Sequence, residues 1–350
     1  MLVGMFVFFA LNPGQGVTTV PEVDVTALNQ DMCDFLEENI GKVHDPYNRF
    51  RSLVYLVFSE KFLDLAYDNT HTKTAIETFE TRNGNCLSFT NMFVGMARHI
   101  GLNVSYQEVY NTPSWDKQGN VVLLNRHMNA MVTIAGSSYV VDFNPYQDHL
   151  ELRTRLVSDA RAKAQYYNNL GAERFQLRDT EGALAYFHKA IKTSPSLSYA
   201  WSNMGAAYTY EKKFDKAEEA YRQAIKHNPR AYTAMSNLAR MYERTGQLDK
   251  AKMYSKKVAR YRKKNPYFHY ALGEEAYLVG NYEEAVEHFK NAIGRKRKVH
   301  DFHFAISKAY ARMDNTERSE HHLKKARDLA PDVFNRNRYN AKLEALASTN

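Results

Sequence analysis

The chain has 350 residues, of which 44% are hydrophobic and 25% charged, values that are ordinary for a globular protein with room for two domains. Its two cysteines, Cys33 and Cys86, exclude a disulfide scaffold and a zinc site built from several cysteines. The net charge of +8 is unevenly distributed, because residues 1–160 hold 11 basic and 18 acidic residues and the remainder holds 36 and 21. This asymmetry predicts a domain division near residue 160.

Residues 1–12 are mostly apolar, but the run is too short to span a bilayer. Its length suits the core of a signal peptide, although a basic segment before it is missing. Three interpretations remain open: an export signal that starts upstream, an interfacial anchor giving weak membrane association, or a buried segment. The first is slightly favoured and implies a cell-envelope or periplasmic location, with a cytoplasmic one as the alternative. Residues 13–21 are expected to be a tether.

The front half mixes helical and strand patterns. Helical spacing extends over residues 27–40, 47–67 and 88–100, and Gly101 is expected to end the third helix. Strands are expected over 104–110, 121–124, 127–134 and 138–143, the last two joined by a turn at 135–137. Helices followed by an antiparallel meander indicate an α+β fold. Residues 150–164 are expected to form a helix that leads into the back half without a flexible linker.

Cys86 directly precedes the third expected helix, behind Asn83-Gly84-Asn85. A thiol in this place lies at the positive end of the helix dipole and beside unpaired N–H groups, which favours the nucleophilic thiolate. His127 opens one strand of the expected hairpin and Asp142 closes the next, so that a hydrogen bond between them is geometrically easy. If the sheet packs on the helix carrying Cys86, a nucleophile, a base and an orienting group converge.

These residues lie in a set of local motifs that resembles the transglutaminase-like superfamily. The motifs are Gly84-Asn85-Cys86-Leu87-Ser88, Arg98-His99-Ile100-Gly101-Leu102, Arg126-His127-Met128-Asn129 and Tyr139-Val140-Val141-Asp142-Phe143-Asn144-Pro145. The resemblance covers about residues 45–150 and implies a papain-like core with a Cys-His-Asp triad in this chain order. Matched residue by residue, it makes Cys86 the nucleophile, His127 the general base and acid, and Asp142 the orienting group. It places this domain at residues 22–155, behind the apolar segment and tether of residues 1–21.

The surroundings of the expected site are less determined. The backbone N–H of Cys86 is the expected oxyanion donor. Trp115, in a loop expected over 111–120, is a candidate second donor or substrate wall, or only an anchor for that loop. Cys33 occupies an apolar helical position beside Phe35 and Leu36 and is expected to be a packing residue. No cofactor or metal is expected, because the closely spaced histidines near the C-terminus lack a carboxylate or cysteine to complete a site.

The back half repeats with a period of 34 residues over five frames, which begin at Ala164, Ser198, Tyr232, Pro266 and His300. Position 8 of the frame is always small (Gly171, Gly205, Ala239, Gly273, Ser307), and position 24 is bulky in four frames (Phe187, Tyr221, Phe289, Leu323). The pattern resembles the tetratricopeptide consensus and implies an all-α solenoid over residues 164–333. The third frame is weakest, with Ser255 at position 24. Residues 334–350 are expected to be a capping helix.

Such an array implies a protein or peptide partner bound in its concave groove. Asn169, Asn203 and Asn237 share position 6, where amides can hydrogen-bond a peptide backbone or simply follow the consensus. Tyr267 and Tyr270 are candidate aromatic groove residues. The basic residues are expected on solvated outer faces, so nucleic acid is not expected as a partner. The oligomeric state is left open.

The leading functional hypothesis is a cysteine-dependent acyl-transfer enzyme, either a protease or amidase or a transglutaminase-like enzyme, with the repeats as a partner-binding arm. The alternative is a non-catalytic scaffold that keeps a vestigial transglutaminase-like domain. The charge asymmetry and the expected helical linker also suggest that the first repeats pack against the catalytic domain.

Overall fold

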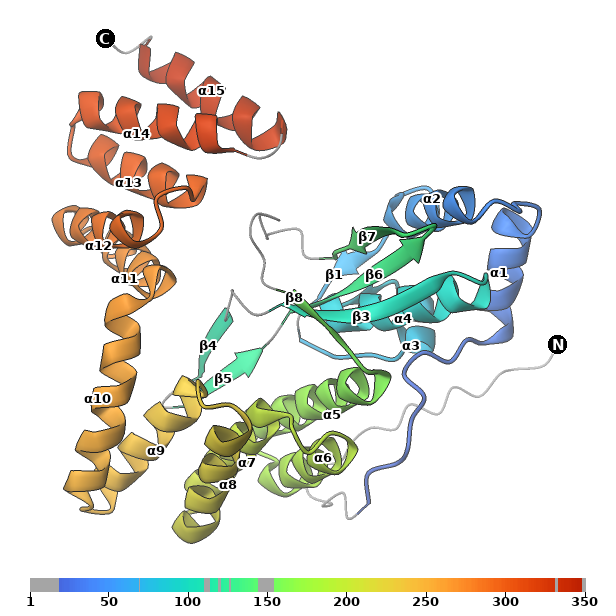
Figure 1. Cartoon of the computed structure of the whole chain (residues 1–350), viewed down its shortest axis with the longest axis horizontal. Coiled ribbons are helices and arrows are strands. Elements are labelled where there is room, and N and C mark those ends of the chain that lie inside the picture. The colour runs from blue at the N-terminus through green and yellow to red at the C-terminus, as the bar shows by residue number, and fades with distance from the viewer. Residues whose placement is uncertain are drawn as a thin grey trace. The chain divides into compact units, whose positions relative to one another are not determined.

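The computed structural model (Figure 1) describes residues 19–68, 70–109, 114–118, 121–125, 127–143, 154–330 and 333–347, without the side chains of 114–118, 121–125, 333–334 and 347. The chain divides into two units, Met1–Ala251 and Lys252–Asn350. The first unit holds the expected α+β domain together with the first repeats. The second unit holds the remaining repeats.

Four helices open the first unit: α1 (Gln30–Ile40), α2 (Pro46–Phe58), α3 (Ala75–Thr81) and α4 (Cys86–His99). Each begins at a side-chain cap, as the capping preferences of Asn, Asp and Thr predict. The helix expected over 47–67 is wrong beyond Phe58, because Ala66–Tyr67 forms strand β1 and pairs in parallel with β2 (Asn83–Gly84). Gly101 follows α4 with a φ of +77°, as expected for a residue that ends a helix.

The main sheet has the strand order β7-β6-β3-β8, with every neighbouring pair antiparallel. Its strands are β3 (Asn103–Val109), β6 (Met128–Ile134), β7 (Ser137–Val141) and β8 (Thr154–Val157). The two-residue turn Ala135-Gly136 joins β6 to β7 with positive φ at both residues, so the expected hairpin is confirmed. The helix expected over 150–164 is wrong at its start, because β8 pairs with the edge of β3 and α5 begins only at Asp159.

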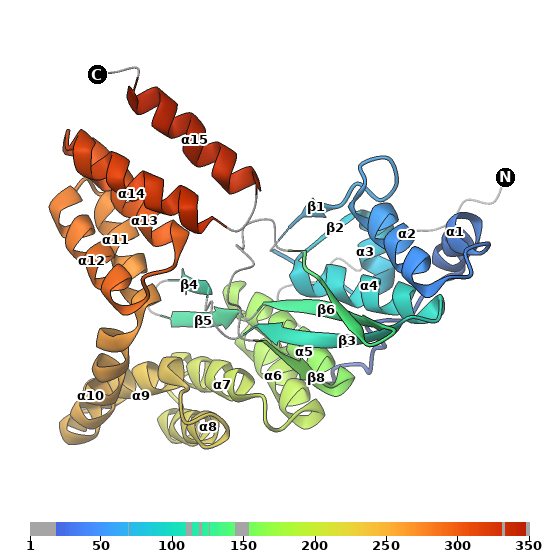
Figure 2. The same cartoon turned by 45° about the horizontal axis from the view of Figure 1, so that its top comes forward.

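The loop expected over 111–120 is wrong at its centre, because β4 (Ser114–Gln118) forms a strand there. It pairs in antiparallel fashion with β5 (Val121–Asn125), where a strand was expected over 121–124, and within the described residues the two form a separate two-stranded sheet. Strand β5 lies beside helices α7 and α9 of the repeats in both Figure 1 and Figure 2.

Helix α4 is the centre of the α+β core and packs on β3 and β6 (Figure 2). Its residues from Leu87 to Ala97 are all buried. Gly95 allows the N-terminal segment to approach, because a Cβ there would lie 2.4 Å from the backbone oxygen of Thr26. From Leu87 to Ala97, α4 is therefore enclosed on every side, and the polar Ser88, Thr90 and Asn91 are buried together with its apolar residues.

Four pairs of successive helices pack against each other in the described part of the array. They are α5 (Asp159–Gln176) with α6 (Thr180–Thr193), α7 (Ser198–Tyr210) with α8 (Phe214–His227), α11 (Pro266–Leu278) with α12 (Tyr282–Arg295), and α13 (His300–Arg312) with α14 (Thr316–Leu329). Between the second and third of these pairs lie α9 (Tyr232–Arg244) and α10 (Leu248–Lys264), and the boundary between the two units falls within α10. The small residue at position 8 faces the bulky one at position 24. A Cβ on Gly171 would lie 2.7 Å from the ring of Phe187, and one on Gly205 would lie 2.7 Å from Tyr221.

The boundary between the two units falls at Ala251, inside the third frame, whose consensus is the weakest. At the C-terminal end, helix α15 (Val333–Ala347) packs on α14. Its Tyr339 is fully buried in a cluster with Phe304, Leu323 and Ala326, where a capping helix was expected.

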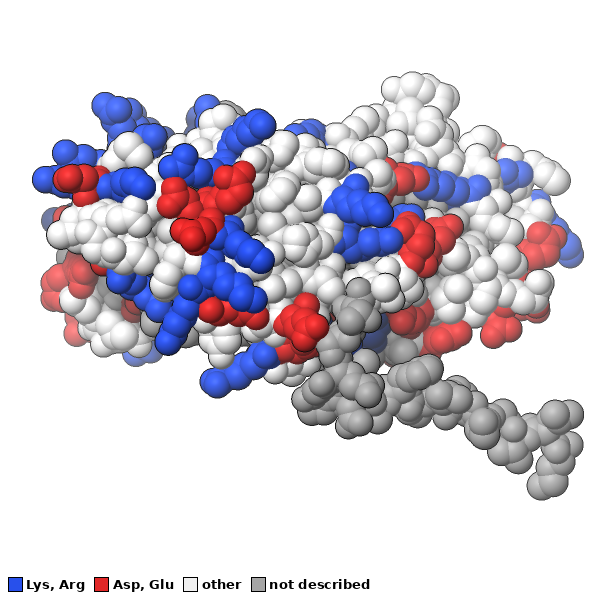
Figure 3. Space-filling model, turned by 90° about the horizontal axis from the view of Figure 1, so that it is seen from below, with Lys and Arg blue, Asp and Glu red and all other residues white. Residues whose placement is uncertain are grey.

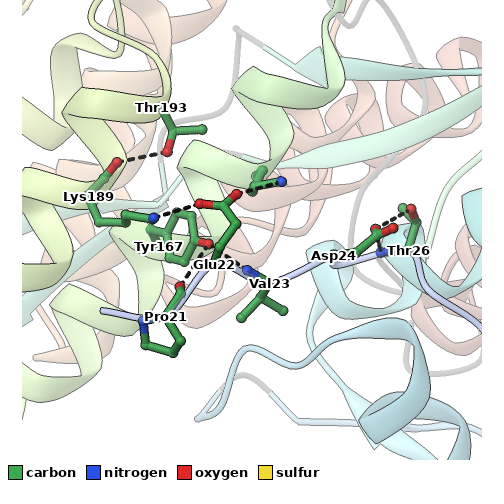
Figure 4. A network of polar contacts seen from close by, with 9 residues as sticks. Pro21, Glu22, Val23, Asp24, Thr26, Tyr167, Lys189 and Thr193 are labelled. Carbon is green, nitrogen blue, oxygen red and sulfur yellow. Dashed lines mark hydrogen bonds and ion pairs between the residues drawn. The ribbon is translucent and has the colours of Figure 1, made fainter. Parts of the chain in front are cut away.

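The first repeat shares a hydrophobic core with the α+β domain. Ala162, Tyr166 and Tyr167 of α5 belong to the same buried cluster as the core residues of α4 and the sheet. On the polar side of this junction, Glu22 accepts hydrogen bonds from Lys189 (Figure 4) and from Lys163, which lower its pKa to about 2. The expected packing of the first repeat against the domain is therefore confirmed.

The surface carries charges of both signs. On the face drawn in Figure 3, Lys and Arg lie beside Asp and Glu rather than in one region of a single sign. Within the ranges that the structure describes, we find no helix with the length and apolar character needed to cross a membrane.

Candidate active site

Cys86 is the first residue of α4, and its thiol is half-buried and free. The preceding residue, Asn85, caps the helix: its Oδ1 accepts hydrogen bonds from the backbone N–H and the hydroxyl of Ser88, both at 3.0 Å. Gly84 is required for this close turn, because a Cβ there would lie 2.7 Å from the Cβ of Ser88. The local sequence thus places the thiol beside the unpaired N–H groups of the first helical turn.

His127 and Asp142 form a buried pair on neighbouring strands. His127 Nε2 lies 2.6 Å from Asp142 Oδ1, and the two side chains are 6% and 2% exposed. His127 directly precedes β6, and Asp142 directly follows β7, so the hairpin register brings them together. The second oxygen of the carboxylate, Asp142 Oδ2, accepts a hydrogen bond from Asn129 Nδ2 at 3.1 Å.

The first turn of α4 is attached to the strand that begins beside His127. The Thr90 hydroxyl lies 2.7 Å from the backbone oxygen of Cys86 and 3.1 Å from that of Met128, and it can donate to either. The Thr90 hydroxyl therefore lies between the backbone of Cys86 and that of Met128, the residue after His127.

The ring of His127 interacts with Cys86 as well as with Asp142. Burial by itself lowers the pKa of His127, but the hydrogen bond to Asp142 and the interaction with Cys86 outweigh it and raise the pKa to about 10. Nδ1 of His127 is buried and has no hydrogen bond of ordinary geometry within the described part of the chain. The imidazole is therefore held by the carboxylate on one side and influenced by the thiol on the other.

Two residues of this arrangement, Asn129 and Thr90, were not predicted from the sequence. A signal for each was present. Asn129 lies two residues after His127 on the same strand face, and Thr90 lies four residues after Cys86 on the same helix face.

The other candidate residues lie elsewhere. Trp115 is in β4 opposite Leu124, and its side chain is outside the described residues. Cys33 is half-buried, and its sulfur lies 4.0 Å from Nδ1 of His99. No role in the proposed chemistry follows from either placement.

The candidate groove residues are engaged within the array. Asn169 is partly exposed, whereas Asn203 and Asn237 are buried, and Asn203 Nδ2 donates to Asn168 Oδ1 at 3.0 Å. Tyr267 and Tyr270 pack on Phe302, with ring centroids 5.4 and 5.1 Å from it. A peptide-binding role for these residues stays a prediction.

Histidines gather at one place in the second unit, where His303 Nδ1 and His322 Nδ1 are 3.0 Å apart. No group of three or more His, Cys, Asp or Glu residues in the described ranges is arranged to hold a metal ion.

Comparison with protein families divides the chain in the same way. Residues 34–143 match the transglutaminase-like superfamily core. Tetratricopeptide repeat families match residues 164–197, 198–230, 220–253 and 270–333. The chain therefore contains a transglutaminase-like core domain followed by tetratricopeptide repeats.

Solved structures with similarity to this chain include YrrB and MamA. YrrB, described as a tetratricopeptide protein with an unusual peptide-binding site, is 20% identical over 49% of this chain and 89% of its own, with a TM-score of 0.28. MamA from AMB-1 is 22% identical over 49% of this chain and 94% of its own, with a TM-score of 0.26. A search of curated proteins gives no match.

Proposed function

We propose that this chain, in which a transglutaminase-like core domain precedes tetratricopeptide repeats, is a cysteine-dependent acyl-transfer enzyme with a protein-binding arm. The observation that carries the proposal is the placement of Cys86 at the start of α4 together with the buried His127–Asp142 pair that interacts with it. A nucleophile, a proton carrier and an orienting carboxylate are the three groups that thiol-dependent acyl transfer needs.

In the proposed reaction, the Cys86 thiolate attacks an amide carbonyl, and the carbonyl π electrons move to oxygen to give a tetrahedral oxyanion. The backbone N–H of Cys86 belongs to the first turn of α4, where N–H groups have no acceptor within the helix, and it is the proposed donor to that oxyanion. The intermediate collapses to a thioester as the C–N bond breaks, and His127 gives its proton to the departing amine.

The second half-reaction regenerates the thiolate. Water or a second amine attacks the thioester carbonyl, loses a proton to His127 and releases the acyl group. Water gives hydrolysis, whereas an amine gives cross-linking. The same three side chains serve both outcomes, and we favour hydrolysis.

The raised pKa of His127 fits this role. With a pKa of about 10, the imidazole carries a proton at neutral pH, so it is ready to protonate a leaving amine. The protonated ring pairs with the Asp142 carboxylate on one side and interacts with Cys86 on the other. Asn129 holds the second carboxylate oxygen and keeps Asp142 turned toward the ring.

The repeats supply the partner-binding part of the proposal. Tetratricopeptide arrays bind proteins or peptides, and here the first repeat shares a core with the catalytic domain. A polypeptide held by the first repeats would therefore be bound by helices that share a core with the domain that carries Cys86.

The direct test is the alkylation of Cys86 by iodoacetamide in the full chain, followed peptide by peptide with mass spectrometry. We expect Cys86 to react faster at pH 6 than Cys33 and a free thiol, and His127→Ala to remove this advantage. Cys33 is the matched internal control, since it is also half-buried and free. A Cys86 that reacts no faster than a free thiol would instead support the non-catalytic scaffold.

The substrate and the partner can be sought with one variant. Cys86→Ala keeps the fold of the site while it prevents the thioester from forming, so a bound substrate is not consumed. Mass spectrometry of proteins captured by this variant, compared with those captured by the unaltered chain, identifies candidates for both roles.

A further inference from the structure

A continuous path of hydrogen bonds connects the first repeat to the residue before Cys86. Glu173, on α5, accepts a hydrogen bond through Oε1 from the backbone N–H of Thr72 at 2.7 Å. The Thr72 hydroxyl in turn accepts from Asn85 Nδ2 at 2.8 Å. Asn85 is the cap of α4, and its Oδ1 holds the N–H and the hydroxyl of Ser88.

The residues of this path are buried, and one further hydrogen bond connects the same two segments. Thr72 and Asn85 are 5% and 9% exposed, and Ser88 is fully buried. The backbone N–H of Lys73 donates to the Ser88 hydroxyl at 2.8 Å, so two consecutive residues of the segment before α3 contact the start of α4. Because buried polar groups need their partners, a shift of Thr72 would require Asn85 to shift as well.

Glu173 is not an ordinary surface carboxylate. Burial raises its pKa to about 7 against the hydrogen bonds from Thr72, which lower it. The nearby Asp68 raises the pKa further and Arg174 lowers it, while the hydroxyls of Tyr166 and Tyr186 lie close enough to sense its charge. The group that donates to Glu173 from the catalytic domain is the backbone N–H of Thr72.

We propose that Glu173 of the first repeat is a positioning residue for Cys86, acting through Thr72 and Asn85. The proposal rests on the proposed function, because it concerns the orientation of the same nucleophile. Asn85 immediately precedes Cys86, so a change in the Asn85 cap alters the direction of the Cys86 thiol and of the N–H that faces the oxyanion. The contact between Glu173 of α5 and Thr72 thereby influences the reactivity of Cys86.

The experiment compares Cys86 alkylation in the full chain across three substitutions. Glu173→Leu removes the acceptor and keeps a side chain of similar size, and Thr72→Val removes the hydroxyl that receives Asn85. Both are expected to slow alkylation by iodoacetamide at pH 6 about tenfold, the effect of losing roughly one hydrogen bond. Glu173→Gln keeps an acceptor oxygen and is expected to retain most of the rate.

The pH profile separates positioning from general loss of structure. A charged acceptor makes a stronger hydrogen bond than a neutral one, so ionisation of Glu173 near pH 7 is expected to add an inflection to the alkylation profile. Glu173→Gln should remove that inflection, whereas the control Glu181→Leu, an exposed carboxylate on α6, should leave it in place.

The outcomes distinguish the two proposals. If Cys86 of the unaltered chain is fast at pH 6 and Glu173→Leu and Thr72→Val are equally fast, the positioning role is overturned and the proposed function stands. If Cys86 of the unaltered chain is no faster than a free thiol, the proposed function fails and the positioning role fails with it. Slow alkylation in both variants, with the rate restored in Glu173→Gln, supports the positioning role.

Discussion

His127 Nε2 and Asp142 Oδ1 are 2.6 Å apart at the end of the β6–β7 hairpin, and both side chains are almost completely buried. The pair is oriented by the register of the hairpin and by Asn129, so the ring does not depend on a flexible loop for its position. Because the pairing raises the pKa of His127 in the folded state, the ionisation of this residue should contribute to the pH dependence of stability.

The first prediction is that Asp142→Asn weakens the pH dependence of stability above pH 6.5. The folded pKa of His127 is about 10 against an ordinary 6.5, so the folded protein binds more protons in this window. Its contribution is present below pH 6.5 and is lost as the pH rises through about 10. Denaturant unfolding from pH 6.5 to 10 should show a smaller decline in the variant than in the unaltered chain.

The control for this prediction is Asp45→Asn, which alters an exposed carboxylate that caps α2 and is not part of the His127–Asp142 pair. It should change stability by a small and equal amount at every pH in the window, because asparagine caps a helix about as well as aspartate. An unchanged pH slope in Asp142→Asn would contradict the interpretation that Asp142 holds the proton on His127.

Local signals predicted much of the site because its parts are local. Gly84 and Asn85 identify the start of α4, and the turn after Ile134 identifies the hairpin that brings His127 to Asp142. Strand β8 could not be predicted in this way. Its partner β3 lies about fifty residues earlier, and the ladder with β3 outweighs the helical pattern of residues 150–164.

The connection through Glu173 was also beyond the sequence pattern. Glu173 belongs to a repeat helix, and its partner is a backbone N–H in a segment 101 residues earlier. Because almost every residue has a backbone N–H, a hydrogen bond to the main chain cannot be predicted from the type of the donating residue. The close approach of Thr26 to Gly95 could not be predicted either, because the glycine shows that there is room for a neighbour but does not identify it.

A second prediction concerns the ion pairs that join β3 to β8 and α5. Oε2 of the fully buried Glu108 lies 2.9 Å from Arg161 Nε and 2.9 Å from Arg155 Nη2. Arg161 is 13% exposed and Arg155 is 48% exposed. We expect Arg161→Met to lower the free energy of unfolding by about 3 kcal/mol, because it leaves a buried charge poorly compensated.

Arg155→Met is the matched control for this pair, and it should cost only about 1 kcal/mol because the arginine is half-exposed. Both substitutions keep an unbranched apolar stem, so the comparison isolates the guanidinium. Equal losses in the two variants, measured by denaturant unfolding, would show that burial of the arginine does not decide the strength of the contact.

The third prediction tests the small residue at position 8 of the repeat. A Cβ on Gly205 would lie 2.7 Å from the Tyr221 ring, so Gly205→Ala should destabilise the chain by about 2 kcal/mol through overpacking. Tyr221→Leu in the same chain should recover part of this loss, which a double-mutant cycle measures. Gly294→Ala is the control: Gly294 is a helical glycine with no atom near its missing Cβ, and the change should stabilise by about 0.5 kcal/mol.

The last prediction concerns His303 and His322, whose Nδ1 atoms are 3.0 Å apart in the second unit. Burial lowers the pKa of His322, and the charges of His303, His321, Lys325 and Lys290 lower it further, to about 4. The unfolded chain, with an ordinary value of 6.5, therefore binds more protons between pH 6.5 and 4, and stability should fall as the pH falls through that window.

His322→Gln removes the titrating ring and keeps a hydrogen-bonding side chain, so the second unit should lose less stability on acidification. Thermal unfolding of the full chain at pH values between 6.5 and 4 measures the effect. His44→Gln, at an exposed position in the first unit, serves as the control and should leave the acid sensitivity unchanged. If His322→Gln is as acid-sensitive as the unaltered chain, the two facing imidazoles do not limit the stability of the second unit, and the source must lie in other groups that titrate in the same window.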